Sequence, residues 1–124
     1  MIEHPQTAAT PGSHLPFSPC AKFGSLLFVS GQASVDAAGR IVSDSFEGEV
    51  RRSIDNLRKV LESAGSSLRH VVQTRNYVRN PENLAVFNRV YAECFQEPFP
   101  ARTTLTHCLP ELLQYEIECI AVVS

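Results

Sequence analysis

The chain lacks the segments that direct proteins into or across membranes. No apolar run approaches the ~20 residues that a membrane-spanning helix requires. Residues 1–15 contain no apolar stretch of the kind found in a secretory signal peptide. The cysteines show no framework spacing, which is typical of free thiols in a reducing compartment. The sequence therefore predicts a cytoplasmic protein with no membrane partner.

Features of metal and nucleic-acid binding are also scarce. The cysteines, at positions 20, 94, 108 and 119, form no C-x-x-C pair and have no zinc-ligand spacing. The 11 basic residues are outnumbered by 13 acidic ones, and the net charge is -2. The densest basic group lies within 51–59, where a solvated helix face is expected. We therefore predict no metal site and no nucleic-acid partner.

What is present is the composition of an ordinary small globular protein. The chain has 124 residues, of which 44% are hydrophobic and 19% charged. This length predicts one domain with a modest core. Residues 1–15 are rich in Pro, Thr, Ala, Gly and Ser, and predict an N-terminal arm. The single domain is then expected over 16–124.

Hydrophobic periodicity predicts two helices and five strands. Apolar residues recur at three-to-four spacing over 46–64, Asp44 or Ser45 can serve as N-cap, and Gly65 is a natural stop. Asn80-Pro81 is expected to open the second helix, as cap and first helical residue. Strands are expected at about 17–22, 26–30, 70–79, 102–108 and 114–123, and helices at about 46–64 and 80–95.

This order predicts an α+β fold in which a mixed sheet carries both amphipathic helices on one face. The other face is expected to carry Val71, Gln73, Arg75 and Tyr77, or the alternate set of that strand. Such a partly apolar free face is often covered by a second copy of the same protein. We therefore expect a homo-oligomer.

The last quarter of the chain places charges beside and within its most apolar segment. Arg102 follows Pro100-Ala101 and enters a predicted strand, and Glu116 and Glu118 interrupt the final strand on the same sheet face. Charges are costly to bury unless they are paired or used. A guanidinium suits a carboxylate ligand, and a half-buried glutamate suits water activation. The pattern predicts a site for a small carboxylic acid; the alternative is an ion pair of Arg102 with one of the glutamates.

At this point the motifs resemble those of the RidA/YjgF family of enamine/imine deaminases, also called the L-PSP endoribonuclease family. The resemblance runs from about Leu15 to Val122. The matching blocks are Pro16-Phe17-Ser18, Leu27-Phe28-Val29-Ser30-Gly31-Gln32, Ile54-Asp55-Asn56-Leu57, Leu61-Glu62-Ser63-Ala64-Gly65, Val71-Val72, Phe87-Asn88-x-x-Tyr91, Pro100-Ala101-Arg102, Leu109-Pro110 and Glu116-Ile117-Glu118-x-Ile120-Ala121.

The resemblance implies a chorismate-mutase-like fold and a homotrimer with a central β-barrel. Its active sites would lie between neighbouring subunits. The implied activity is hydrolysis of reactive enamines and imines of the 2-aminoacrylate type to 2-oxo acids and ammonia. The implied ligand is thus a small 2-imino or 2-oxo carboxylic acid, and no cofactor is expected.

The resemblance also implies roles for particular residues. Arg102 would bind the substrate carboxylate and Glu116 would position the attacking water, which makes both catalytic. Ser30 and Gly31 would hold substrate or water through backbone atoms. Asn88 occupies the family's asparagine position, although it could instead only bridge helix and strand. Glu118 is expected to be structural, paired with a cation or a hydroxyl.

Three departures from the family pattern concern the pocket. Phe17 stands where many members have tyrosine, and Thr104 stands where many have cysteine; both are kept as substrate-binding candidates. The segment from Arg102 to Leu109 is one residue shorter than usual, and we expect an adjustment near 106–108. Two alternative functions remain: a non-catalytic binder of small carboxylates or chaperone-like trimer, and an endoribonuclease.

Overall fold

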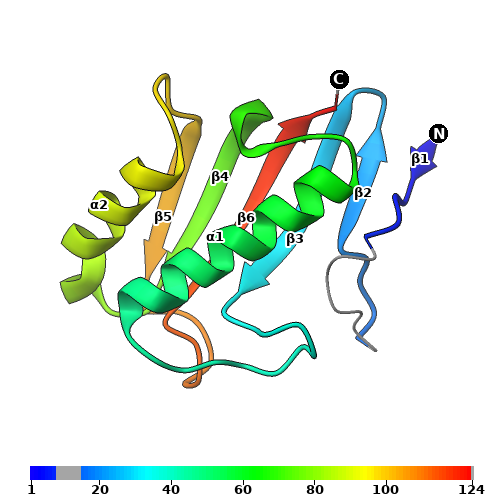
Figure 1. The fold of residues 1–124 in the computed structure, drawn as a ribbon. Coiled ribbons are helices and arrows are strands. Elements are labelled where there is room, and N and C mark those ends of the chain that lie inside the picture. Colours follow the sequence, from blue (N-terminus) through cyan, green and yellow to red (C-terminus); the bar gives the residue numbers. More distant parts are fainter. Residues whose placement is uncertain (8–14, 124) are drawn as a thin grey trace.

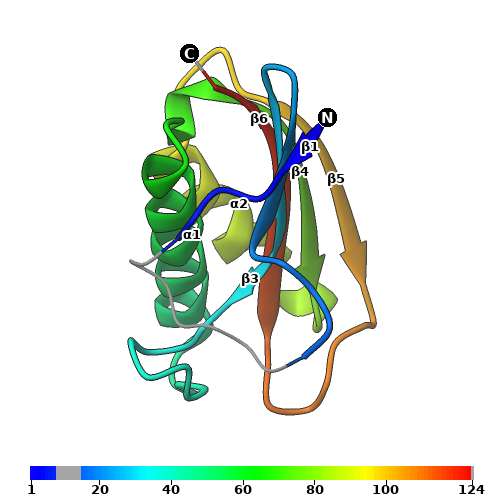
Figure 2. The same cartoon turned by 90° about the vertical axis from the view of Figure 1, so that its right-hand side faces the viewer.

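A six-stranded sheet with two helices on one face forms the protein (Figures 1 and 2). The structure is a computed structural model that describes residues 1–7 and 15–123. The elements are β1 (Ile2–Glu3), β2 (Cys20–Phe23), β3 (Leu26–Ala33), α1 (Phe46–Ser63), the 3-10 turn η1 (Leu68–His70), β4 (Val71–Val78), the 3-10 turn η2 (Pro81–Asn83), α2 (Leu84–Cys94), β5 (Ala101–Thr106) and β6 (Tyr115–Val122). The predicted α+β class with helices on one face is confirmed.

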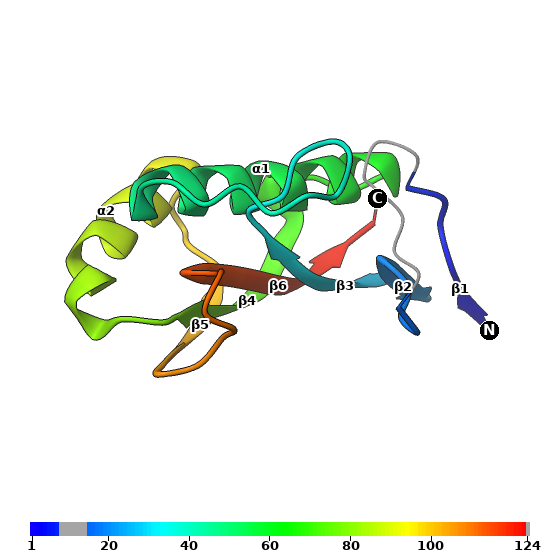
Figure 3. The ribbon, with the colours of Figure 1, turned by 90° about the horizontal axis from the view of Figure 1, so that it is seen from below.

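The sheet order is β1-β2-β3-β6-β4-β5, so the last strand of the chain lies in the middle. Neighbouring strands pair antiparallel, except that β4 and β5 are parallel. The parallel pair exists because α2 carries the chain back across the sheet between β4 and β5. Figure 3 shows both helices in one layer above the sheet, with the opposite face uncovered.

α1 forms as its apolar spacing predicts. Ser45 is the N-cap, because its hydroxyl accepts a hydrogen bond of 3.0 Å from the amide of Gly48. Gly65 follows the helix with φ +84°, a left-handed conformation that glycine adopts without strain. The buried side of α1 packs against β3 and β6 and supplies much of the core.

The second helix starts later than predicted. Asn80 does act as a cap, since its side chain accepts from the amide of Glu82 at 2.9 Å. The turn that it caps is the 3-10 turn η2, and α2 begins only at Leu84. A proline at the first position and two polar residues after it suit one tight turn before the apolar stripe starts.

The side chains of β4 do not all face as a strict alternation requires. Gln73, Arg75 and Tyr77 lie on the uncovered face, as expected for that set. Val71 is instead buried in the core, because the pairing of β4 with β6 shifts register between Val71 and Gln73. A bulge of this kind changes the face of every residue before it.

The N-terminal segment contributes an edge strand. Ile2–Glu3 pair with β2, and Glu3 forms a 3.3 Å ion pair with Lys22. Part of the predicted arm, 8–14, lies outside the described residues. The division into an arm over 1–15 and a domain over 16–124 stays a prediction.

The basic group of α1 is paired with acidic neighbours. Arg51 and Arg89 each contact both Glu47 and Glu93, which forms a ring of four charges between α1 and α2. The remaining basic residues of α1, Arg52, Arg58 and Lys59, also lie beside carboxylates. This part of the surface is a mixed ionic network that ties α2 to α1, as a solvated helix face would be.

Candidate functional site

Arg102 lies on the helix-bearing side of the sheet, at the edge strand β5. Its guanidinium carbon is 5.0 Å from the ring centre of Phe87 and 5.1 Å from that of Tyr91, both on α2. The two rings are four residues apart, so they share one face of the helix. Cations are attracted to aromatic ring faces at this distance. The rings therefore form a shelf that holds the guanidinium.

No carboxylate among the described residues lies within ion-pair distance of Arg102. Within one chain, an ion pair of Arg102 with Glu116 or Glu118 is therefore excluded. The guanidinium borders a pocket of about 240 Å³ that is lined by Asn88, Tyr91, Ala92, Phe99, Pro100 and Arg102. Its walls are mostly apolar, with one amide and one charge. An exposed, unpaired guanidinium over such a pocket can bind a carboxylate that carries a small substituent.

Thr104 follows two residues after Arg102 and so faces the same side of β5. Its hydroxyl oxygen is buried, and it has no hydrogen-bond partner among the described residues. Buried polar atoms are normally paired, so this hydroxyl is an unused donor next to the arginine. Asn88 is exposed on α2 and lines the same pocket. The structure thus brings three of the predicted residues together on this side.

Glu116 and Glu118 lie on the uncovered face of the sheet. In β6 every second residue from Tyr115 to Ala121 faces the helices and is buried. The residues between them, which include both glutamates, are partly exposed. The two glutamates therefore share one face, as predicted. That face is opposite to the one that bears Arg102.

Glu116 lies directly over Gly31. A Cβ added to Gly31 would lie 2.5 Å from the Glu116 Oε2 atom and 2.9 Å from its Cδ. The missing side chain thus provides the space that the carboxylate occupies, beside an irregularity in the pairing of β3 with β6. Close approach of Glu116 to the β3 backbone is a reason for glycine at this position, in addition to any contact with a ligand.

The two carboxylates have different surroundings. Burial, followed by the nearby charge of Glu118, raises the pKa of Glu116 above its usual value. Glu118 accepts a hydrogen bond from the Tyr77 hydroxyl and lies 3.8 Å from the Arg75 Nη1 atom. The expected pairing of Glu118 with a cation or a hydroxyl is confirmed, and the structure provides both. Glu116 has no such partner among the described residues and is the group available to accept a proton.

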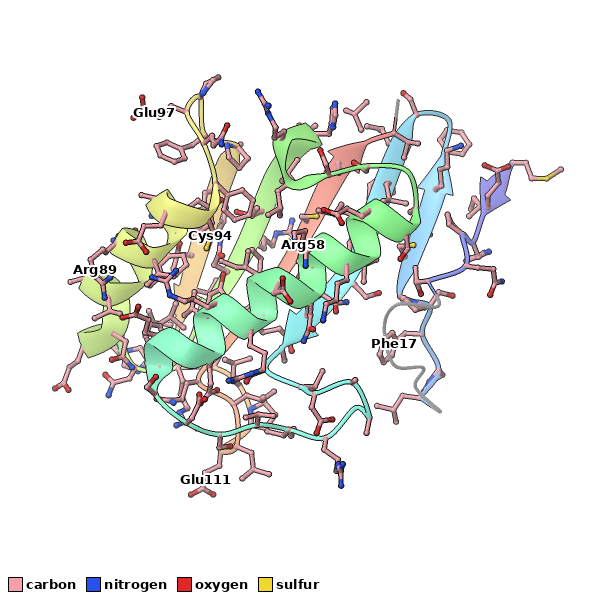
Figure 4. The ribbon with its side chains drawn as sticks, in the orientation of Figure 1. Phe17, Arg58, Arg89, Cys94, Glu97 and Glu111 are labelled. Carbon is pink, nitrogen blue, oxygen red and sulfur yellow. The ribbon has the colours of Figure 1, made fainter. Side chains whose placement is uncertain are left out.

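Ser30 and Phe17 lie on the Gly31 side of the molecule. The Ser30 hydroxyl donates to the carbonyl of Ser18 at 2.6 Å, and its amide donates to the carbonyl of Pro19 at 2.9 Å. These bonds hold the segment after Phe17 against β3. Phe17 itself is 53% exposed, and Figure 4 shows it far from Arg89 of α2. Within one chain, Phe17 therefore does not contact the Arg102 pocket.

The predicted residues thus form two half-sites. Arg102, Asn88 and Thr104 gather at α2 and β5, and Glu116, Gly31 and Ser30 gather on the other face or beside it, with Phe17 at the same end. Their assigned roles stay predictions. Sequence reasoning placed Phe87 and Tyr91 in the core stripe of α2 but missed their contact with Arg102. Their i, i+4 spacing showed in the sequence that both rings lie on one face of the helix. The sequence did not show that β5, and with it Arg102, lies beside that face.

The segment 106–108, where we expected the shorter chain to be accommodated, lies at the end of β5 and in the turn that follows it. β5 ends at Thr106, and both His107 (φ 61°) and Leu109 (φ 88°) have positive φ values. These left-handed residues turn the chain sharply before β6. The turn is anchored to α1, since the buried Glu49 carboxylate accepts from the backbone and side-chain amides of Gln114 at 3.1 and 2.6 Å.

The described residues contain neither a cluster of metal ligands nor a membrane-spanning helix. No group of three or more histidine, cysteine or acidic side chains lies in a metal-binding arrangement within 1–7 and 15–123. No helix in the described part of the chain has the length and apolar character to span a membrane. The cysteines in this part are free thiols, and burial raises the pKa of Cys119 to about 12.

These features define a class of protein: a small α+β domain with an arginine beside an aromatic shelf on one sheet face and a half-buried glutamate on the other. The sequence profile described as Endoribonuclease L-PSP matches residues 7–123. The chain therefore belongs to this family, the RidA/YjgF family that its motifs resemble.

Curated relatives and solved structures agree with this membership. A RutC family protein of Pyrococcus horikoshii is 37% identical over 108 residues, 86% of each chain. A 2-iminobutanoate/2-iminopropanoate deaminase of Dermatophagoides farinae is 31% identical and covers 88% of this chain and 87% of its own. The mitochondrial protein mmf2 of Schizosaccharomyces pombe is 38% identical over 86% of each chain. Cytoplasmic location stays a prediction for the present chain.

The crystal structure of E. coli TdcF with bound serine superposes with a TM-score of 0.87 at 29% identity, covering 98% of this chain and 99% of that one. Serine is a small molecule that bears a carboxylate. A related protein with this fold therefore binds a small carboxylate-bearing molecule.

Proposed function

We propose that this protein hydrolyses small 2-imino acids and their enamine tautomers to 2-oxo acids and ammonia. The observation that carries the proposal is Arg102, a guanidinium with no carboxylate partner in the described part of the chain, held over an aromatic shelf at the mouth of a small pocket. The relative named as an imine deaminase and the serine-bound structure support the same ligand class.

The complete site requires two copies of the chain. Arg102 and Glu116 lie on opposite faces of one sheet, so one small ligand cannot reach both within a single subunit. A neighbouring subunit could supply the second half-site, as in the homotrimer that the family resemblance implies. The uncovered face supports this assembly, because it exposes large apolar side chains such as Phe28, Val72 and Leu105.

In the proposed reaction, Arg102 holds the carboxylate of the iminium ion through two parallel hydrogen bonds. Glu116 accepts a proton from a water molecule while the water oxygen bonds to the imine carbon. The C=N electron pair moves to nitrogen, which gives a carbinolamine. Glu116 then returns the proton to nitrogen, and the C–N bond breaks with its electron pair going to nitrogen, which releases ammonia. Glu116 takes the remaining hydroxyl proton as the carbonyl forms and passes it to the ammonia. Water and iminium ion thus yield 2-oxo acid and ammonium.

The raised pKa of Glu116 suits this exchange. A carboxylate in water is a weak base, and raising its pKa brings it closer to the working pH, where it can both accept and return a proton. Asn88 and the Thr104 hydroxyl would contact the substrate from the Arg102 side. Backbone groups at Ser30 and Gly31 would contact it from the Glu116 side.

The test generates the imine in place. An amino-acid oxidase produces the 2-imino acid, semicarbazide traps it, and the protein should lower the yield of semicarbazone by consuming the imine first. Arg102→Ala should abolish this effect while the oligomer measured by light scattering is retained. An unchanged semicarbazone yield with wild-type protein, across several small imino acids, overturns the proposal.

Carboxylate binding without turnover would instead favour the non-catalytic binder. Endoribonuclease activity is the second alternative, because it is in the description of the matching family. The basic residues of α1 are paired with carboxylates, which leaves a weaker positive surface for RNA. RNA cleavage that persists in Arg102→Ala would support that alternative.

A further inference from the structure

Arg102 owes its position to the aromatic shelf, because β5 is an edge strand and no ion pair holds the guanidinium among the described residues. Arginine has many rotamers, and an exposed side chain loses freedom when it is fixed for a ligand. Whatever orients the rings of Phe87 and Tyr91 therefore also determines how well Arg102 is aligned for a carboxylate.

The Tyr91 hydroxyl is the end of a buried chain of hydrogen bonds. It lies 2.7 Å from the Thr74 Oγ1 atom, and Thr74 accepts from the Asn76 side-chain amide at 3.0 Å. The Oδ1 atom of Asn76 in turn accepts from the Tyr115 hydroxyl at 2.5 Å. Thr74, Asn76 and Tyr115 are fully buried. The chain runs from β6 through β4 to α2.

The chain lies directly behind the arginine. In the parallel pairing of β4 with β5, Thr74 is the partner of Arg102 and Asn76 is the partner of Thr104. Three buried polar side chains in a core are costly unless each is paired, and here each one is. Apolar side chains could have filled this space without any polar group. The row of hydrogen bonds therefore provides something that packing alone does not, which is a fixed direction for the Tyr91 ring.

The other contacts of Tyr91 involve its ring, so the hydroxyl makes the hydrogen bond that restrains the ring's direction. Phe95 stacks on Tyr91 with ring centres 4.4 Å apart, and Phe87 meets it edge-on at 5.5 Å. Ring contacts tolerate sliding, whereas a short hydrogen bond in a buried site fixes the ring along one direction. Arg102 covers the same ring at 5.1 Å.

We propose that Tyr91, held through its hydroxyl by Thr74, Asn76 and Tyr115, is a positioning residue that aligns Arg102 for the carboxylate of the ligand. This inference rests on the proposed function, since it assigns Arg102 a carboxylate ligand. The ring of Tyr91 also borders the pocket, but the proposed role acts through the arginine and does not require Tyr91 to contact the ligand.

The probe is pyruvate, the 2-oxo acid product of the smallest 2-imino acid that has an enamine tautomer, and its Kd is measured by calorimetry. Tyr91→Phe keeps the ring and removes the hydroxyl, and Thr74→Val removes the other partner of the same hydrogen bond. Each should raise the Kd about threefold to tenfold, the range expected when one buried hydrogen bond is lost. The double variant should bind no more weakly than Thr74→Val alone, because Thr74→Val already removes the bond to Tyr91 together with the bond from Asn76.

A structural role alone would change stability without changing Kd. Val60→Ala, a buried residue of α1, serves as a control that lowers the melting temperature with the arginine shelf intact. If Tyr91→Phe and Thr74→Val bind pyruvate as tightly as Val60→Ala does, the inference is overturned. Arg102→Lys separates failure of the inference about Tyr91 from failure of the proposed function. Loss of binding in this variant with normal binding in Tyr91→Phe overturns only the inference, whereas a wild-type protein that binds no pyruvate overturns both.

Discussion

Replacing Gly31 by alanine should uncouple activity from stability. The added methyl group would lie 2.5 Å from the Glu116 Oε2 atom, whereas ordinary contacts begin at 3.4 Å. The Glu116 carboxylate must therefore move by about 1 Å. Gly31 is absent from the glycines with positive φ, so alanine can adopt its backbone conformation and the steric conflict is confined to one side chain.

The two consequences differ in size. A displacement of about 1 Å in a catalytic group lowers turnover by about 10²-fold, so kcat for imine hydrolysis should fall by that order. Stability should change by less than about 1 kcal/mol, because the displaced atoms end a flexible side chain and alanine also restricts the unfolded chain. The measurements are semicarbazone competition for kcat and urea unfolding for stability.

A double variant tests the cause. In Glu116→Ala the carboxylate is already absent, so adding Gly31→Ala should cost no further activity if displacement of that carboxylate is the mechanism. A wild-type kcat in Gly31→Ala would refute the reasoning. So would an equal, independent loss in the double variant, since it would mean that Gly31 acts by contacting the ligand and not by making room for Glu116.

Three further outcomes are expected. Glu118→Gln removes a like charge that raises the pKa of Glu116, so the pKa of Glu116 should fall. Because a base must be ionised to act, the acidic limb of the kcat/KM profile should then move to lower pH, and a move to higher pH would contradict this. Tyr115→Phe deprives the buried Asn76 Oδ1 of its donor and should destabilise the fold by about 1–3 kcal/mol in urea unfolding, so an unchanged midpoint would argue against the hydrogen bond. Cys119, whose pKa is raised to about 12 by burial, should resist iodoacetamide at about pH 8 in the native protein, as peptide mass spectrometry would show.

The sequence predicted the local elements because their determinants are local. The apolar spacing of α1, the Ser45 cap and the Gly65 stop act within one helix, and the structure has the helix at Phe46–Ser63. The prediction for the second helix was less accurate. Asn80-Pro81 starts a 3-10 turn as readily as an α-helix, since both turns accept the same cap and the same proline.

The shared face of Glu116 and Glu118 also followed from the sequence, because strand alternation is a property of the backbone. Alternation failed at Val71, where the bulge against β6 depends on a partner strand far along the chain. No pattern within residues 70–79 encodes that shift.

By itself the sequence determined the α+β class, the first helix and the main strands, the family and the candidate residues Arg102 and Glu116. Only the tertiary structure decided that these two lie on opposite faces of the sheet, because a side chain's face depends on how its strand enters the sheet. β6 lies centrally and points both glutamates away from the helices, whereas β5 lies at the edge beside α2 and directs Arg102 onto two aromatic rings. Long-range packing made the half-sites, and a single chain cannot join them.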